Sequence, residues 1–206
     1  MRIGIMGGTF DPIHNAHLFL AEEARVSYSL ERVLFVPNGN PPHKEGELLT
    51  SAEHRFAMTE IAIAGNPYFF ASRLELDRAG IVYTYDTLRL LQEEYPSAKI
   101  YYLTGIDTVL EMLTWHRPQE VLKMAQFIAA TRPGFDSSQI AERLPESFEK
   151  RISLLPTTEL NISSTEIRAR VRKGKPIRYL TPERVVDYIE AHRLYLNEGV
   201  RERAYI

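Results

Sequence analysis

Residues 2–17 of the chain read RIGIMGGTFDPIHNAH, and this stretch decides the fold that we predict. Its first part, Arg2–Met6, is a short apolar run that indicates a strand. Two glycines and a proline-containing turn follow, and apolar residues then recur with helical spacing over Ala16–Tyr28. A strand, a glycine-rich turn and a helix in this order predict the opening unit of an α/β protein.

The same alternation of strands and helices continues along the chain. We predict further strands at Arg32–Val36, Phe69–Leu76, Lys99–Leu103, Gln126–Thr131 and Ile152–Leu155. We predict further helices from Ser51 to about Ala64, at Thr84–Tyr95, Ser137–Lys150 and Ser163–Lys173, and from a Thr181–Pro182 start to about His192. Right-handed crossovers then give a doubly wound, Rossmann-like parallel sheet with helices on both faces. We expect one domain over residues 1–206, on which a C-terminal helical part, about 163–206, packs.

The composition excludes several classes of function. The 25 Lys and Arg residues against 27 Asp and Glu leave no basic excess for non-specific nucleic-acid binding. The absence of cysteine removes disulfides, cysteine-ligated zinc and thiol catalysis. No apolar stretch reaches the roughly 18 residues of a membrane span, and the N-terminus has no secretory pattern. We therefore expect a cytoplasmic protein with no membrane or nucleic-acid partner.

The turn after the first strand carries the clearest chemistry. Ligands of doubly wound sheets bind beyond the carboxyl ends of the strands, and Gly7 and Gly8 let a ligand approach the backbone there. His14 and His17 lie three residues apart at a helix start, where free N–H groups favour phosphate. A purely structural glycine turn and a metal-binding histidine pair are the alternatives. The pattern matches neither the P-loop nor the G-x-G-x-x-G fingerprint.

Other polar and aromatic residues follow later strands. Ser163, Ser164 and Arg168 open a helix and indicate a second anion site, although Ser163–Glu166 also fits an ordinary capping box. Trp115 is the only tryptophan, and its ring suits stacking on a flat heterocycle as well as a core position.

Gly7–His17 (GGTFDPIHNAH) resembles the signature of the HIGH-type nucleotidylyltransferase superfamily. Five further segments make the chain similar to the bacterial nicotinate-nucleotide adenylyltransferases: Pro41–Lys44 (PPHK), Tyr83–Leu88 (YTYDTL), Thr114–His116 (TWH), Thr131–Gly134 (TRPG) and Ile162–Arg168 (ISSTEIR). The chain departs from the family pattern at Ala16, where glycine is usual, and at Ile106 and Thr108 beside Gly105 and Asp107.

The resemblance implies transfer of an adenylyl group from ATP to nicotinate mononucleotide, giving deamido-NAD⁺ and pyrophosphate in NAD biosynthesis. It implies these catalytic residues: His14, His17, Lys44 and Arg168. It implies these ATP contacts: Gly7, Gly8, Thr9, Phe10, His17, Gly105, Asp107, Arg132, Ile162, Ser163, Ser164 and Arg168. It implies these nicotinate mononucleotide contacts: Gly8, Thr9, Asn38, Lys44, Thr84, Trp115 and His116.

The same resemblance implies Mg²⁺ that arrives with ATP, no dedicated protein metal site, and a homodimer or larger homo-oligomer. For Asp107, an ordinary helix N-cap is an equal alternative to a contact with ATP. Other functions also stay open. These are an adenylyltransferase that acts on nicotinamide mononucleotide or phosphopantetheine, and a nucleotide sensor without turnover. A metal-dependent hydrolase that uses the two histidines is a further alternative.

Overall fold

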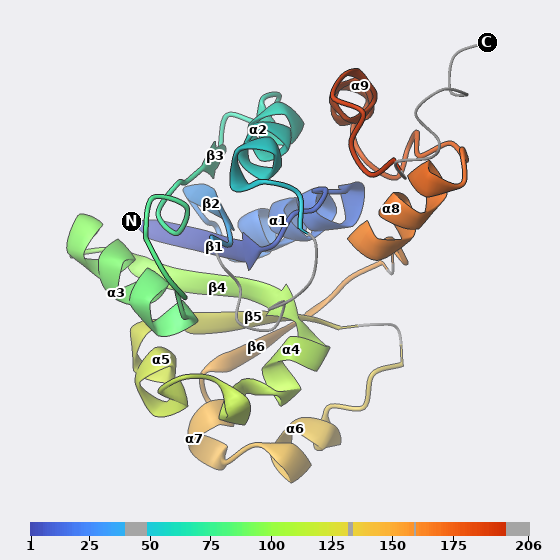
Figure 1. Ribbon diagram of the computed structural model, residues 1–206. Coiled ribbons are helices and arrows are strands. Elements are labelled where there is room, and N and C mark those ends of the chain that lie inside the picture. Colours follow the sequence, from blue (N-terminus) through green and yellow to red (C-terminus); the bar gives the residue numbers. More distant parts are fainter. Residues whose placement is uncertain (40–48, 132–133, 159, 197–206) are drawn as a thin grey trace.

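A computed structural model describes residues 1–39, 49–131, 134–158 and 160–196 (Figure 1). Within these residues one parallel sheet has the strand order β3-β2-β1-β4-β5-β6. Its strands are β1 (Arg2–Gly8), β2 (Arg32–Pro37), β3 (Phe69–Ala71), β4 (Lys99–Gly105), β5 (Gln126–Thr131) and β6 (Ile152–Pro156). The predicted doubly wound sheet is therefore confirmed.

The strand order sets the place where a ligand can bind. The chain adds β2 and β3 on one side of β1, then crosses over and adds β4, β5 and β6 on the other side. Ile3 of β1 consequently lies between Arg32 of β2 and Ile100 of β4. The direction of winding reverses between β1 and β4, and doubly wound folds bind ligands at the carboxyl ends of the strands at such a point.

Helices cover both faces of the sheet, as Figure 1 shows. One layer consists of α1 (Asn15–Ser27), α2 (Ala52–Ile63), α8 (Ser164–Arg172) and α9 (Glu183–Ala191). The other consists of α3 (Thr84–Glu94), α4 (Ile106–Leu110), the 3₁₀ turn η2 (Met112–Thr114), α5 (Pro118–Met124), α6 (Ser138–Arg143) and α7 (Glu146–Glu149). Alternate residues of β1 serve the two cores: Ile3 and Ile5 pack on one side and Met6 on the other.

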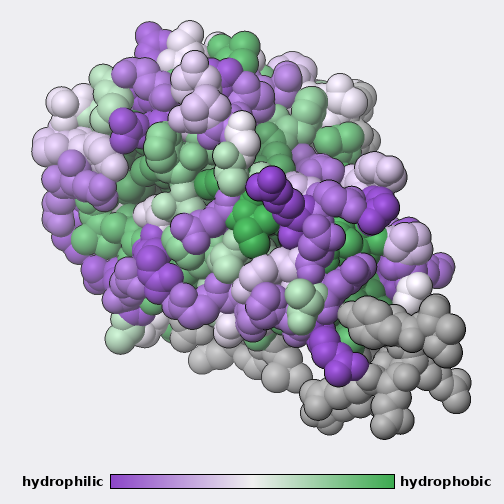
Figure 2. All heavy atoms as spheres, turned by 90° about the horizontal axis from the view of Figure 1, so that it is seen from above, coloured by the Kyte–Doolittle hydropathy of each residue, from purple (hydrophilic) through white to green (hydrophobic). Residues whose placement is uncertain are grey.

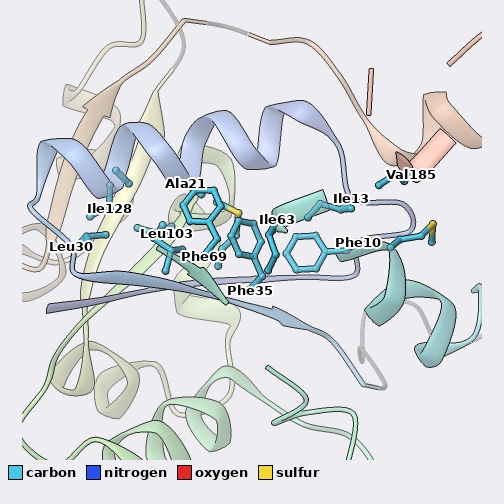
Figure 3. Close-up of a cluster of buried hydrophobic side chains, with 14 of the residues drawn as sticks. Phe10, Ile13, Ala21, Leu30, Phe35, Ile63, Phe69, Leu103, Ile128 and Val185 are labelled. Carbon is cyan, nitrogen blue, oxygen red and sulfur yellow. The ribbon is translucent and has the colours of Figure 1, made fainter. Parts of the chain in front are cut away.

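The core between the sheet and α1 reaches into the glycine-rich turn. Figure 3 shows the Phe10 ring in line with the rings of Phe35 and Phe69. The centroids of Phe10 and Phe35 lie 6.0 Å apart, and those of Phe35 and Phe69 lie 5.1 Å apart. Burying one such ring contributes about 1.5–3 kcal/mol to folding. Hydrophobic packing of Phe10 in the core therefore holds the turn after β1 in place.

Two predicted elements are wrong in extent. The strand predicted at Phe69–Leu76 ends at Ala71, because the chain then turns, with the N–H of Asp77 donating to the carbonyl of Arg73 (3.1 Å). The helix predicted at Ser137–Lys150 is two short helices, because Pro145 cannot donate a backbone N–H to continue the first.

The surface that carries α2 and α9 faces the viewer in Figure 2. Hydrophobic residues show between hydrophilic ones across this face. Among the described residues, no helix combines the length and the apolar character that crossing a membrane requires. Because helices cover both faces of the sheet, the carboxyl ends of the strands are where a ligand can reach it.

Candidate active site

Steric contacts fix the glycines at the end of β1. A Cβ atom on Gly7 would lie 2.7 Å from the hydroxyl oxygen of Tyr102, and one on Gly8 would lie 2.9 Å from Cε1 of Phe10. Phe10 itself adopts a left-handed backbone conformation, with φ of 48°. The whole residue is 1% exposed, so the structure gives no support to the predicted contact of the Phe10 side chain with ATP. The Phe10 ring instead supports His17, edge to face, with centroids 5.0 Å apart.

The two histidines form a stacked pair at the start of α1. Their ring centroids lie 3.6 Å apart, with 20° between the ring planes. The backbone N–H of His14 donates to Nδ1 of His17 (3.2 Å). Nδ1 of His17 is therefore an acceptor, so the neutral ring carries its proton on Nε2. Nδ1 of His14 is buried without a hydrogen-bond partner in the described part of the chain.

Both imidazoles are neutral at pH 7. Burial lowers the pKa of His14 to about 4, and burial together with the neighbouring His14 lowers the pKa of His17 well below its ordinary value. Neutral rings donate hydrogen bonds without carrying charge. Because a bound phosphate stabilises the protonated form, its negative charge would raise both pKa values.

The predicted second anion site lies against this turn. Ser163 caps α8 by accepting from the N–H of Glu166 (3.1 Å), as the capping interpretation predicted. The Ser164 hydroxyl donates to the Pro12 carbonyl, and the Arg168 guanidinium donates to the Asp11 carbonyl, both at 2.8 Å. The amino ends of α1 and α8 are thus joined directly.

The segment before α9 holds the same turn from another side. The Thr181 hydroxyl donates to the Ile13 carbonyl (2.7 Å) and does not cap the last helix, which corrects the predicted start. The Asn15 N–H donates to the Leu180 carbonyl (2.9 Å). Residues distant in sequence therefore complete the turn.

Sequence reasoning missed the buried arginine below the turn. Arg55 of α2 is 2% exposed, and its guanidinium donates to the carbonyls of Thr9 (2.7 Å), Thr50 (3.0 Å) and Gly39 (3.4 Å). Asp11 faces it and accepts from the Thr50 N–H (3.2 Å) and the Tyr195 hydroxyl (2.8 Å). A charged residue on the buried side of the helix was the available signal.

A first pocket of about 310 Å³ opens at the switch point between β1 and β4. It is lined by Gly7, Asn38, Val82, Tyr83, Thr84, Tyr102, Thr104, Thr108, Thr114, Trp115 and His116. It brings together four residues predicted for nicotinate mononucleotide, namely Asn38, Thr84, Trp115 and His116, and adds Gly7, which was predicted for ATP. Gly8 and Thr9 do not line it.

Aromatic rings build the walls of this first pocket. His116 stacks on Tyr83, with centroids 4.4 Å apart, and Trp115 packs edge-on against Tyr102 at 6.0 Å. Sequence reasoning missed Tyr102 and Thr104, which line this pocket from β4. Residues two apart on a strand point to the same face, so their spacing could have placed both side chains together.

A second pocket of about 350 Å³ lies between α1, the ends of β4 and β5, and the segment before α8. It is lined by Ala16, Phe19, Leu20, Gly105, Ile106, Asp107, Ala130, Thr131, Thr157, Thr158, Leu160, Asn161, Ile162 and Ser163. Four residues predicted for ATP meet here: Gly105, Asp107, Ile162 and Ser163. Gly105 is the N-cap of α4, so the N-cap alternative for Asp107 is wrong. Lys44 and Arg132 lie outside the described residues.

A doubly wound sheet with a histidine pair and two pockets at its carboxyl edge is the arrangement of a nucleotidyltransferase. In agreement, the Cytidylyltransferase-like family model matches residues 5–170. A protein of Moorella thermoacetica called "Probable nicotinate-nucleotide adenylyltransferase" is 50% identical over 98% of this chain and 96% of its own length. One of Desulfitobacterium hafniense with the same name is 49% identical over 94% and 95%. The chain belongs to the nicotinate-nucleotide adenylyltransferase family.

Solved structures agree with this assignment. The Plasmodium falciparum nicotinic acid mononucleotide adenylyltransferase complexed with NaAD superposes with a TM-score of 0.74 at 25% identity, over 94% of this chain and 97% of that one. The same enzyme complexed with APC gives the same TM-score and identity.

The contact between Gly7 and Tyr102 predicts a rescue. Gly7→Ala should lower the free energy of unfolding by about 1–3 kcal/mol, because the new methyl group meets the Tyr102 hydroxyl. Tyr102→Phe removes that oxygen and leaves ring carbon 3.5 Å away. The double variant should therefore recover most of the loss in urea unfolding. Strictly additive losses would contradict the steric explanation.

The lowered pKa of His14 predicts a pH dependence of stability. In the unfolded chain His14 binds a proton near pH 6.5, and in the folded chain it does so only near pH 4. The contribution of the neutral ring to the free energy of unfolding is therefore fully present above pH 6.5 and is lost as the pH falls toward 4. The shift corresponds to about 3 kcal/mol. Urea unfolding at several pH values gives the free energy of unfolding as a function of pH. Between pH 6.5 and 4 this free energy should fall less steeply for His14→Gln than for the unchanged chain. Equal slopes would argue against a buried neutral imidazole.

Proposed function

We propose that the chain transfers the adenylyl group of ATP to nicotinate mononucleotide and releases deamido-NAD⁺ and pyrophosphate. One observation carries this proposal: residues 7–17 contribute Gly7 to the first pocket and Ala16 to the second, with the histidine pair on the same segment. A reaction that joins two nucleotides needs such a segment between two binding sites.

The chemistry needs positioning more than activation. An oxygen of the nicotinate mononucleotide phosphate attacks the α-phosphorus of ATP, the bond from that phosphorus to the bridging α–β oxygen breaks, and pyrophosphate leaves with the electron pair. The attacking phosphate is already an anion at neutral pH, so no general base is required. His14 and His17 donate hydrogen bonds to the α-phosphate as its charge develops, from positions that the stack has already fixed.

The first pocket receives nicotinate mononucleotide in this proposal. Trp115 and His116 offer aromatic faces to the pyridine ring, and Thr84 lies at the amino end of α3, where free N–H groups favour a carboxylate. Those N–H groups favour the acid over the neutral amide by charge. The second pocket receives ATP, with Gly105, Asp107, Ile162 and Ser163 around it.

Three cationic residues complete the proposal. Arg168 holds the Asp11 carbonyl, and its guanidinium carries five N–H groups, so it can also meet phosphate oxygens. Lys44 and Arg132 are proposed as phosphate contacts from the sequence resemblance alone.

Mg²⁺ enters this proposal bound to the ATP phosphates, where it neutralises charge and keeps several waters. Within the described ranges no group of three His, Cys, Asp or Glu side chains has the arrangement to hold a metal ion. The homo-oligomeric state, the cytoplasmic location and the absence of nucleic-acid partners remain predictions from the sequence.

Pyrophosphate release tests the function. With ATP and Mg²⁺ present, nicotinate mononucleotide should be turned over at least about tenfold faster than nicotinamide mononucleotide, which one lost charged contact would explain. Equal rates with the two mononucleotides would support the adenylyl transfer but contradict the proposal that the first pocket selects the acid. ATP binding without release from either acceptor would favour another acceptor or a sensor.

Removing one of the paired histidines tests the catalytic assignment. His17→Ala should keep the fold and lower kcat at least about 100-fold, the scale of losing one preorganised donor. His54→Ala is the matched control, because His54 lies on α2 and hydrogen-bonds Tyr188 (2.9 Å), away from the stacked histidine pair of residues 7–17. A His17→Ala variant with nearly normal turnover would contradict the assigned role.

A further inference from the structure

A buried carboxylate stands behind the first pocket, and the reaction just proposed does not use it. Glu75 is 5% exposed and lies in the turn after β3, where the sequence predicted a continuing strand. Its Oε1 accepts from the Thr87 hydroxyl (2.6 Å), and its Oε2 accepts from Nδ2 of Asn38 (2.9 Å). The two donors come from α3 and from the end of β2. Glu75 therefore joins two separate walls of one pocket.

The chain packs closely around this carboxylate. A Cβ atom on Gly39 would lie 2.5 Å from the backbone oxygen of Glu75, so only glycine fits beside it. The backbone of Gly39 also favours the ionised carboxylate, because its N–H group lowers the pKa of Glu75. Burial, together with the nearby carboxylate of Asp86, raises the pKa of Glu75, and the hydrogen bonds to the carboxylate and the nearby charge of Arg55 act in the opposite direction. The position of Asn38 is thus determined by a fixed acceptor and not by solvent.

The acceptor dictates which end of the Asn38 amide faces a ligand. An ionised carboxylate only accepts hydrogen bonds, so Asn38 must turn its NH₂ group toward Glu75. Its other amide atom, the acceptor Oδ1, is then left for the pocket that Asn38 lines. At neutral pH the carboxylate and the phosphate of nicotinate mononucleotide also only accept. The ribose hydroxyls are the only hydrogen-bond donors of that nucleotide.

We propose that Glu75 is a positioning residue that orients Asn38 so that its Oδ1 accepts from a ribose hydroxyl of the nicotinate nucleotide. Through Thr87 the same carboxylate fixes the start of α3, which carries Tyr83 and Thr84 into the pocket. Glu75 acts without touching the substrate. This inference rests on the proposed function, because it takes nicotinate mononucleotide as the occupant of the first pocket.

Exchanging donor and acceptor tests the proposal. Asn38→Asp sets two carboxylates against each other and should raise the KM for nicotinate mononucleotide at least about tenfold, with the KM for ATP changed less than about twofold. In the Asn38→Asp/Glu75→Gln double variant, the new amide donates to the new carboxylate, which still turns an oxygen to the pocket. The double variant should regain most of the lost affinity, and Glu75→Gln alone should change it less than about threefold.

A second measurement keeps the outcome clear if Asn38→Asp folds poorly. Glu75→Ala removes the acceptor of Asn38 and should raise the KM for nicotinate mononucleotide at least about fivefold in the otherwise unchanged chain, but less than about twofold in an Asn38→Ala background, where no amide remains to be oriented. Equal rises in both backgrounds would overturn the role of Glu75. Binding can be followed without turnover through the fluorescence of Trp115, the only tryptophan, which lines the pocket.

The outcomes separate the two proposals. A double variant no better than Asn38→Asp, or an equal rise in the KM for ATP, would overturn the role of Glu75 while leaving the function intact. A wild-type chain that neither binds nor converts nicotinate mononucleotide would overturn the proposed function, and this inference with it.

Discussion

The buried guanidinium of Arg55 is the interaction on which the rest of the site depends. It holds carbonyl groups from three separate segments, at Thr9, Gly39 and Thr50. A buried cation costs several kcal/mol unless it is compensated, and the carboxylates of Asp11 and Glu75 provide that charge. Asp11 lies in the turn after β1 and accepts from Thr50 and Tyr195. Glu75 accepts from Asn38 and Thr87, beside the first pocket. One chain of buried charge therefore sets the relative position of the turn after β1 and the end of β2.

Above this polar layer, the catalytic turn is held by features that exclude charge. The Phe10 ring belongs to the hydrophobic core and supports His17, while the stacked histidines are neutral because they are desolvated. Two neutral rings stacked at this distance avoid the repulsion that two imidazolium ions would suffer. The turn can therefore bury both rings without a charged partner beside them.

Local patterns predicted the sheet and part of the lining of the two pockets, and the failures have physical reasons. Gly7, His14 and Ser163 follow strands or open helices, where chain order alone fixes which edge they reach. Arg55, Glu75 and Tyr102 act through tertiary contacts, which no local period reveals. The predicted strand at Phe69–Leu76 was too long because β-propensity does not register the turn that buries Glu75. Pro145 was a visible signal that the predicted helix at Ser137–Lys150 is broken.

The contacts from α8 and from the segment before α9 have a consequence for the growing chain. Pro12 and Ile13 are among the first residues to be synthesised. The hydroxyl groups that donate to their carbonyls belong to Ser164 and Thr181, which follow 152 and 168 positions later. At about 5–20 residues per second, a ribosome needs roughly 8–30 s to supply them. A nascent chain can therefore build the first strands well before the turn between its two pockets has all of its hydrogen-bond partners, so this turn is among the last parts of the fold to be completed.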